Sequence, residues 1–302
     1  MSDKLYIIGN GLDIAHNLPT KFDPDFKRIA DKHEIDHFWN IYQSREDSIW
    51  ADFENLLGTP DFNCLEDIFD GYEPDYSSEH EYDRDSIITQ VHTNGLLQEE
   101  LTEFVNNAEK AMNGVKPKDS IKQIIDSDGY YITFNYTHTL EKIYRIPQNQ
   151  VLHIHGEAGH SNMLLGYPEG DFSPEKYLFD ARKKGRGPYA EMDIADYINN
   201  KIEDTYVRNA YLNLLEKCES FSKPSRMPLL KGFLNDHNCK IDEIIVYGHS
   251  CAIDFEYFRY LNRRYPNAQW RFYIKGDKQK NDVNKLIFMN NIGKTSIIEI
   301  MN

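Results

Sequence analysis

The chain opens with a short apolar run that ends abruptly in glycine. Residues 5–8 are Leu, Tyr, Ile and Ile, without the alternation of a strand that has one wet face. Such a run predicts a strand buried on both faces, as in a parallel sheet covered by helices. The turn Gly9-Asn10-Gly11 follows, and its glycines let the backbone bend sharply and expose N–H groups. Strand, glycine turn and helix is the order in which nucleotide sites begin.

The glycine pattern is incomplete. The third glycine of a GxGxxG motif would fall at position 14, which is Ile14, and no Gly-Lys-Ser or Gly-Lys-Thr follows. The turn alone therefore leaves two interpretations open, a nucleotide site or a tight turn that merely needs glycine.

Charge and hydropathy narrow the class of protein. The 302 residues carry 34 Lys and Arg against 49 Asp and Glu, a formal charge of −15. Acidic surfaces disfavour broad nucleic-acid binding. No apolar run approaches the roughly 20 residues of a membrane span, and the N-terminus lacks a signal-peptide layout. We therefore expect a cytoplasmic protein with no membrane partner.

The four cysteines indicate neither a metal motif nor a disulfide framework. None of them lies in a CxxC pair, the spacing typical of zinc ribbons. They are Cys64, Cys218, Cys239 and Cys251.

Strand and helix patterns alternate along the rest of the chain, which predicts a Rossmann-like, doubly wound and mostly parallel α/β sheet. We expect one domain over residues 1–302, with mostly helical insertions at about 59–118 and 157–240. The second insertion is a candidate for a lid, a restraint or a homo-oligomer contact. Further strands are expected at Tyr130–Phe134, Val151–His155, Glu243–Tyr247, Gln269–Ile274 and Thr295–Ile300, and helices at residues 49–57 after Ser48, at 97–112, after Thr137, from Asp254 and at Asn281–Met289.

Four of these strands end in small or polar residues. In an open parallel sheet, ligands bind beyond the carboxyl ends of the strands, so one shared pocket is expected. Asn135 can hold a ribose hydroxyl or a water, and His155 can take a proton near neutral pH. The four clusters are Gly9-Asn10-Gly11, Asn135-Tyr136-Thr137, His155-Gly156 and Gly248-His249-Ser250.

A metal is not expected from the histidine spacing. His153 and His155 are two residues apart on a predicted strand, so both side chains would leave the same face. A metal site needs a third ligand in a recognisable pattern, and the chain contains no HExxH motif.

Five segments together resemble the AbiH family of bacteriophage abortive-infection proteins. The order and the gaps of these segments fit the family, and they lie at both ends and in the middle of the chain. They are residues 5–22, 50–54, 133–141, 151–156 and 247–258.

The same landmarks are similar to those of the wider sirtuin-like superfamily, and the resemblance implies an NAD-binding Rossmann-like domain. By this resemblance, Asn135 would hold the nicotinamide ribose and the attacking water, and His155 would be the catalytic base. The backbone N–H groups of residues 9–12 would bind the pyrophosphate. The residues expected near NAD are Gly9, Asn10, Gly11, Asp13, Tyr136, Gly156, Gly248, His249, Ser250 and Asp254, of which Gly248, Ser250 and Asp254 would lie near the adenosine half.

Two departures from sirtuins refine this expectation. Asp13 lies where sirtuins carry a serine, and the zinc-binding cysteine pairs of protein deacylases are missing. The resemblance therefore implies a defence enzyme that hydrolyses NAD to ADP-ribose and nicotinamide, and that responds to a phage-derived trigger.

Two other functions remain open at this stage. One is a non-catalytic nucleotide-binding sensor or toxin module. The other is a metal-dependent nuclease, for which Asp13, Glu54 and Asp254 would have to converge.

Overall fold

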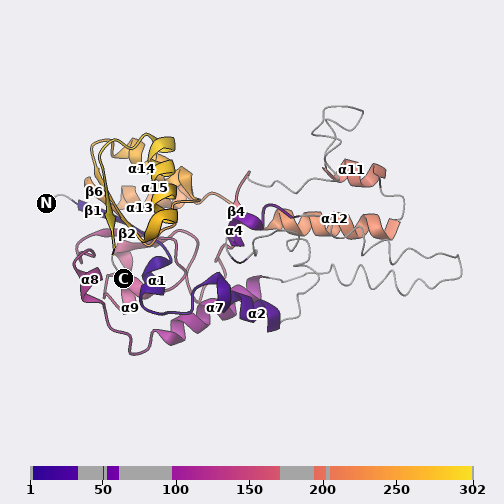
Figure 1. Cartoon of the computed structure of the whole chain (residues 1–302), viewed down its shortest axis with the longest axis horizontal. Coiled ribbons are helices and arrows are strands. Elements are labelled where there is room, and N and C mark those ends of the chain that lie inside the picture. The colour runs from indigo at the N-terminus through magenta and orange to yellow at the C-terminus, as the bar shows by residue number, and fades with distance from the viewer. Residues whose placement is uncertain are drawn as a thin grey trace, which may run out of the picture. The chain divides into compact units, whose positions relative to one another are not determined.

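The computed structural model describes residues 3–32, 50, 53–60, 97–170, 194–201 and 205–300 (Figure 1). Ser48, the expected start of a helix, lies outside the described residues. The chain forms two compact units. The first comprises Met1–Lys21, Leu101–Leu164 and Ser225–Asn302, and the second comprises Phe22–Glu100 and Leu165–Pro224.

A six-stranded sheet forms the centre of the first unit. Its neighbouring strands are parallel, and the strand order is β3-β2-β1-β6-β7-β8. Counted along the chain, this is the 3-2-1-4-5-6 order of dinucleotide-binding folds, so the predicted Rossmann-like α/β class is confirmed. The strands are β1 (Asp3–Ile8), β2 (Tyr130–Thr133), β3 (Val151–His153), β6 (Ile241–Tyr247), β7 (Gln269–Ile274) and β8 (Thr295–Glu299).

The central strand β1 shows why its apolar run does not alternate. Leu5 and Ile7 enter the hydrophobic core on one face of the sheet. Tyr6 and Ile8 enter the core on the other face, and all four side chains are at most 1% exposed. Both faces of β1 are therefore covered, as the sequence predicted.

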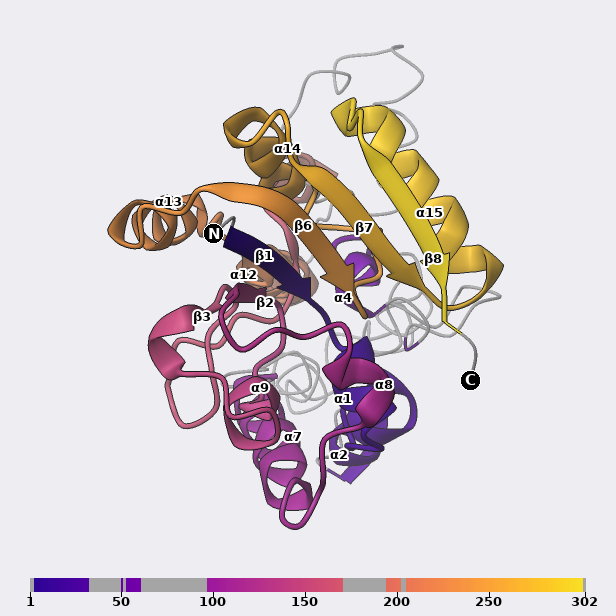
Figure 2. The ribbon, with the colours of Figure 1, turned by 90° about the vertical axis from the view of Figure 1, so that its left-hand side faces the viewer.

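Helices cover both faces of the sheet. Helices α13 (Met227–Asp236), α14 (Phe255–Arg264) and α15 (Gly276–Asn290) supply residues to the core that contains Leu5. Figure 2 shows α14 and α15 behind β6, β7 and β8. The opposite core receives residues from α1 (Gly11–Ala15), α8 (Asp119–Lys122) and α9 (Thr139–Lys142). Helix α7 (Gln98–Ala111) confirms the helix predicted over residues 97–112.

The second unit is built differently. It contains a pair of two-residue parallel strands, β4 (Tyr167–Pro168) and β5 (Ser222–Lys223). Phe26, Trp50 and Phe53 pack as an aromatic cluster, with ring centroids 5.0–6.0 Å apart. Its described helices are η1 (Phe22–Phe26), α2 (Lys27–Lys32), α4 (Phe53–Leu56), α11 (Ile194–Lys201) and α12 (Thr205–Ser220). Within the described part of the chain, no helix combines the length and apolar content of a membrane span.

Close backbone packing joins the turn after β1 to the loop after β6. A Cβ atom on Gly9 would lie 2.5 Å from the Cα of His249, and one on Gly11 would lie 2.5 Å from the Cα of Gly248. Gly248 itself has φ +68°, a conformation that glycine adopts most readily. Because β1 and β6 flank the point where strand order reverses, these glycines set the geometry of the crevice at that point.

We expect Gly9→Ala to lower the free energy of unfolding by about 1–3 kcal/mol, because the added methyl group overlaps backbone atoms that cannot move independently. The matched control is Gly232→Ala in α13, where a Cβ atom meets nothing within 4 Å. This control should raise stability by about 0.4–1 kcal/mol. Urea unfolding of both variants gives the comparison, and equal effects would contradict the packing argument.

Candidate functional site at the strand ends

The backbone N–H groups of the glycine turn donate hydrogen bonds to carbonyl groups of the protein itself. The N–H of Gly9 donates to Tyr247 O at 3.0 Å, and the N–H of Gly11 donates to Gly248 O at 2.8 Å. The N–H of Leu12 donates to Gly9 O at 3.1 Å. Three of the donors expected to bind pyrophosphate therefore have protein acceptors, and close packing accounts for the glycines. The side chain of Asn10 donates to Thr20 O at 2.5 Å.

Asn135 reaches the glycine turn. Its Nδ2 donates to Gly9 O at 3.2 Å, and its backbone N–H donates to Thr133 Oγ1 at 3.1 Å. The side chain is 6% exposed, and its Oδ1 has no hydrogen-bond partner among the described residues. A buried acceptor without a donor costs about 1–3 kcal/mol. The Oδ1 atom is therefore suited to accept a hydrogen bond from a ligand hydroxyl or a water.

Asp13 fixes the loop that carries Asn135. Its carboxylate is buried and accepts hydrogen bonds from Thr137 Oγ1 at 2.5 Å and Thr139 Oγ1 at 2.6 Å. Burial raises the pKa of Asp13 to about 6, and the two hydroxyl donors oppose that shift. The prediction that Thr137 caps a helix is wrong. The N-cap of α9 is His138, and the Thr137 side chain is used in the bond to Asp13.

A second carboxylate lies between two imidazoles. Oδ1 of Asp254 is 3.4 Å from Nε2 of His155, and its Oδ2 is 3.7 Å from Nε2 of His249. All three side chains are at most 7% exposed. The Nδ1 of His249 accepts from the N–H of Cys251, which places the proton of a neutral ring on Nε2, facing Asp254. A carboxylate beside His155 can orient that ring for proton transfer.

The loop that carries Asp254 has unusual backbone geometry. Gly248, Cys251 and Asp254 have φ of +68°, +61° and +65°. Left-handed conformations are costly for residues other than glycine and cluster at functional sites. In this loop, Asp254 is the N-cap of α14, and its carboxylate lies beside the two histidines.

Three other predicted site residues have local roles. The hydroxyl of Tyr136 donates to Leu164 O at 2.6 Å. Gly156 has φ +90°, and a Cβ atom there would meet Asn162 O at 2.6 Å. Ser250 is exposed, and its Oγ accepts from the N–H of Ala252 at 3.4 Å. Ser250 is therefore the one of these three whose side chain faces solvent.

His153 and His155 do not share an environment. Strand β3 ends at His153, so the alternation predicted to extend to His155 is wrong. His155 lies against Asp254 and the ring of Phe134, whereas His153 contacts Glu141 and the backbone carbonyl of Asn135. The chain turns at residues 154–155, and this turn separates the two rings.

A half-buried cluster of charged residues surrounds His153. The ring of His138 contacts Glu109 Oε1 through Nδ1 and Glu157 Oε2 through Nε2, each at 3.2 Å. His153 contacts Glu141 Oε1 through Nε2 at 2.8 Å. Burial raises the pKa of Glu109, but hydrogen bonds from His138 and Lys142 outweigh it and lower that pKa to about 2. This cluster leaves no local sequence pattern, because its members come from α7, from α9 and its N-cap, from the end of β3 and from the loop after β3.

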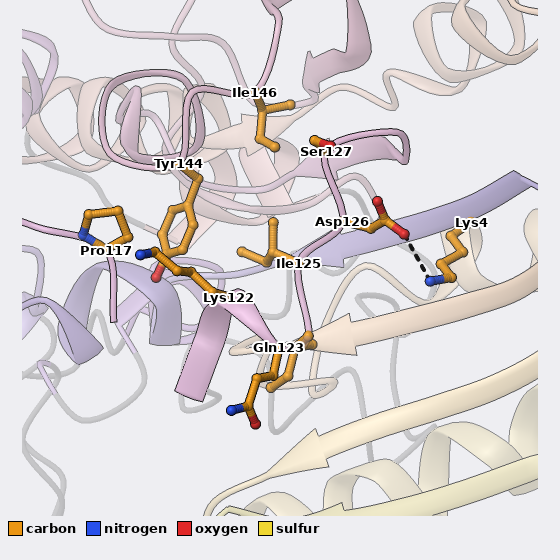
Figure 3. Close-up of a pocket in the computed structure, with 10 residues that line it drawn as sticks. Lys4, Pro117, Lys122, Gln123, Ile125, Asp126, Ser127, Tyr144 and Ile146 are labelled. Carbon is orange, nitrogen blue, oxygen red and sulfur yellow. Dashed lines mark hydrogen bonds and ion pairs between the residues drawn. The ribbon is translucent and has the colours of Figure 1, made fainter. Parts of the chain in front are cut away.

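A pocket of about 520 Å³ lies elsewhere on the first unit (Figure 3). Lys4 and Asp126 line it and form an ion pair at 3.0 Å. Lys4 lies near the start of β1, and Asp126 precedes β2. This pocket therefore lies toward the amino ends of these strands and contains none of the predicted site residues.

The fold and the polar cluster define a class, Rossmann-like α/β proteins with a buried polar site at the carboxyl edge of a parallel sheet. Within that class, the family model of bacteriophage abortive infection AbiH proteins matches residues 5–274, and the chain belongs to this family. The membership ties the protein to phage defence by abortive infection. A search of curated proteins found no match to the chain.

Stability should depend on pH through Asp13. Its folded pKa of about 6 exceeds the ordinary 3.8, so this group's stabilising contribution declines as pH rises from about 4 to about 6. Thr137→Val removes a donor to the ionised carboxylate. We expect it to cost about 1.5–3 kcal/mol at pH 8 and less at pH 4.5, where Asp13 is mostly protonated.

The matched control is Thr20→Val. Thr20 is also buried, and its hydroxyl has no hydrogen-bond partner among the described residues. This variant should change stability equally at both pH values. Denaturant unfolding of the parent and both variants at pH 4.5 and pH 8 measures these changes, and a loss for Thr137→Val that does not depend on pH would contradict the role of Asp13.

Proposed function

We propose that this protein hydrolyses NAD to ADP-ribose and nicotinamide, as the toxic step of abortive infection. The observation that carries the proposal is the position of Asn135. Its amide is bonded to the carbonyl of Gly9, and its Oδ1 lacks a donor among the described residues. The resemblance of these segments to sirtuin-like NAD-binding proteins is the reason for proposing NAD as the substrate.

Hydrolysis of NAD depends on the positioning of substrate and water more than on a covalent bond to the protein. The bond between ribose and nicotinamide breaks through an oxocarbenium-like state, and its electrons go to the ring nitrogen of nicotinamide. A water adds to the ribose carbon and loses one proton. Asn135 Oδ1 accepts a hydrogen bond from that water or a ribose hydroxyl, and His155 takes the proton. General-base catalysis of this kind contributes about 10²–10⁴-fold.

His155 becomes positively charged when it takes the proton, and the Asp254 carboxylate beside it carries the opposite charge. Its Oδ1 lies 3.4 Å from His155 Nε2, close enough to stabilise an imidazolium by electrostatics. His249 shares the same carboxylate, so the position of Asp254 is set from two sides. In this proposal His249 and Asp254 are positioning residues, and Asn135 and His155 are the catalytic ones.

The burial of the site fits an enzyme that is silent before infection. Asn135 is 6% exposed and His155 is 5% exposed, so a dinucleotide needs a conformational change to reach them. The phosphates need donors other than the N–H groups of Gly9, Gly11 and Leu12, which have protein acceptors. The exposed Ser250 at the end of β6 is one candidate donor.

Nicotinamide release by the purified protein, and NAD content of cells with and without phage infection, test the proposal. We expect Asn135→Ala and His155→Ala to lower release at least 10²-fold while the protein stays folded by circular dichroism. The control is His237→Ala, whose ring packs on Tyr130 and Phe233 at the end of α13. Release as fast as the parent in both site variants would refute these roles.

The same preparations separate the rival functions. Calorimetric binding of NAD or ADP-ribose without product would indicate a non-catalytic sensor or toxin module. A metal-dependent nuclease has less support, because its three expected carboxylates each have other partners. Asp13 binds Thr137 and Thr139, Asp254 lies beside two histidines, and Glu54 pairs with Lys223 at 2.9 Å.

A further inference from the structure

Two histidines outside the strand-end site present the same ring nitrogen to a shared space. The Nδ1 of His138 lies 3.2 Å from Glu109 Oε1, and the Nδ1 of His153 lies 2.9 Å from the backbone carbonyl of Asn135. Both acceptors hold a proton on Nδ1. The Nε2 atom of each ring is thereby left as the ligand atom, which is the tautomer that metal-binding histidines adopt when a carboxylate or carbonyl orients them.

Two carboxylates contact these Nε2 atoms, and one of them, Glu157, completes the ligand group. Oε2 of Glu157 lies 3.2 Å from Nε2 of His138, and Oε1 of Glu141 lies 2.8 Å from Nε2 of His153. The ligand atoms of His138, His153 and Glu157 all lie within 4.8 Å of one another. The second oxygen of Glu141 is buried and has no hydrogen-bond partner among the described residues.

We propose that His138, His153 and Glu157 bind a divalent transition metal of the zinc class. Two imidazoles and a carboxylate suit zinc and its neighbours better than magnesium or calcium, which prefer oxygen ligands alone. Bonds of about 2.0–2.2 Å place tetrahedral ligands roughly 3.3 Å apart. The 3.2 Å contact between His138 Nε2 and Glu157 Oε2 is already close to that spacing.

Metal binding exchanges protons for the cation. Zinc binds the unprotonated Nε2 atoms of His138 and His153 and the carboxylate of Glu157, so binding releases any proton held on these atoms. Glu109 stays outside the ligand set and, through its bond to His138, orients the ring. The absence of a HExxH motif does not exclude this site, because the ligands come from the N-cap of α9, the end of β3 and the loop after it.

The test uses the full-length protein after treatment with a chelator and its removal. Titration with Zn²⁺ by calorimetry should show one site with a Kd in the micromolar range or tighter, and Zn²⁺ should raise the melting temperature. Co²⁺ should give the visible absorption bands of a tetrahedral site. The His138→Ala and His153→Ala variants should each weaken zinc binding at least tenfold, and His237→Ala should bind as the parent does.

Glu157→Gln covers the case in which a histidine variant fails to fold. The Glu157 side chain is 23% exposed in a loop, so this nearly isosteric change should leave the fold intact and weaken zinc binding at least tenfold. The proposal is overturned if the parent takes up no Zn²⁺, or if Glu157→Gln and the folded histidine variants bind it with unchanged affinity. The cluster would then be a proton-held charge network. No NAD is present in this assay, so its outcome is independent of the proposed hydrolase.

Discussion

The first unit depends on one close approach, the contact of the backbone after β1 with the backbone after β6. Gly9, Gly11 and Gly248 allow it because side chains at these positions would overlap the opposite segment. The hydrogen bonds from Gly9 to Tyr247 and from Gly11 to Gly248 then hold the two segments together. This places the two strand-end loops side by side at the point where strand order reverses, which is where Rossmann-like folds bind ligands.

Around this contact the structure buries several polar groups that a hydrophobic core would exclude. Asp13, Asn135, His155 and His249 are each at most 6% exposed. Burying such groups costs free energy unless partners compensate, and most of the compensation comes from distant parts of the chain. Thr137 and Thr139, which follow β2, donate to Asp13 in α1, and Asp254 contacts both histidines. Buried charged networks of this kind are weak evidence for stability, because their desolvation can cost as much as their attraction gains.

The strands of the sheet could be predicted from the sequence, but the hydrogen-bond partners of its polar residues could not. Apolar runs located β1 and β6, because strands buried on both faces need consecutive apolar residues. Helix α15 begins at Gly276, before the predicted Asn281, since its exposed first turn carries no apolar periodicity. Thr137 resembled a helix cap by local pattern, yet its partner Asp13 is 124 residues away. Contacts of that range leave no periodic signal, which is also why the glutamates around His138 and His153 were missed.

Asn135 belongs to both polar clusters, through different atoms. Its side-chain amide is bonded to the carbonyl of Gly9, and its main-chain carbonyl accepts from His153. Any change in the position of the His153 ring therefore acts on the backbone that carries the Asn135 amide. A cation at His138 and His153 would fix that ring, and loss of the cation would release it. The two clusters are thus joined by one residue, and the proposed cation would act on the strand-end site through this backbone bond.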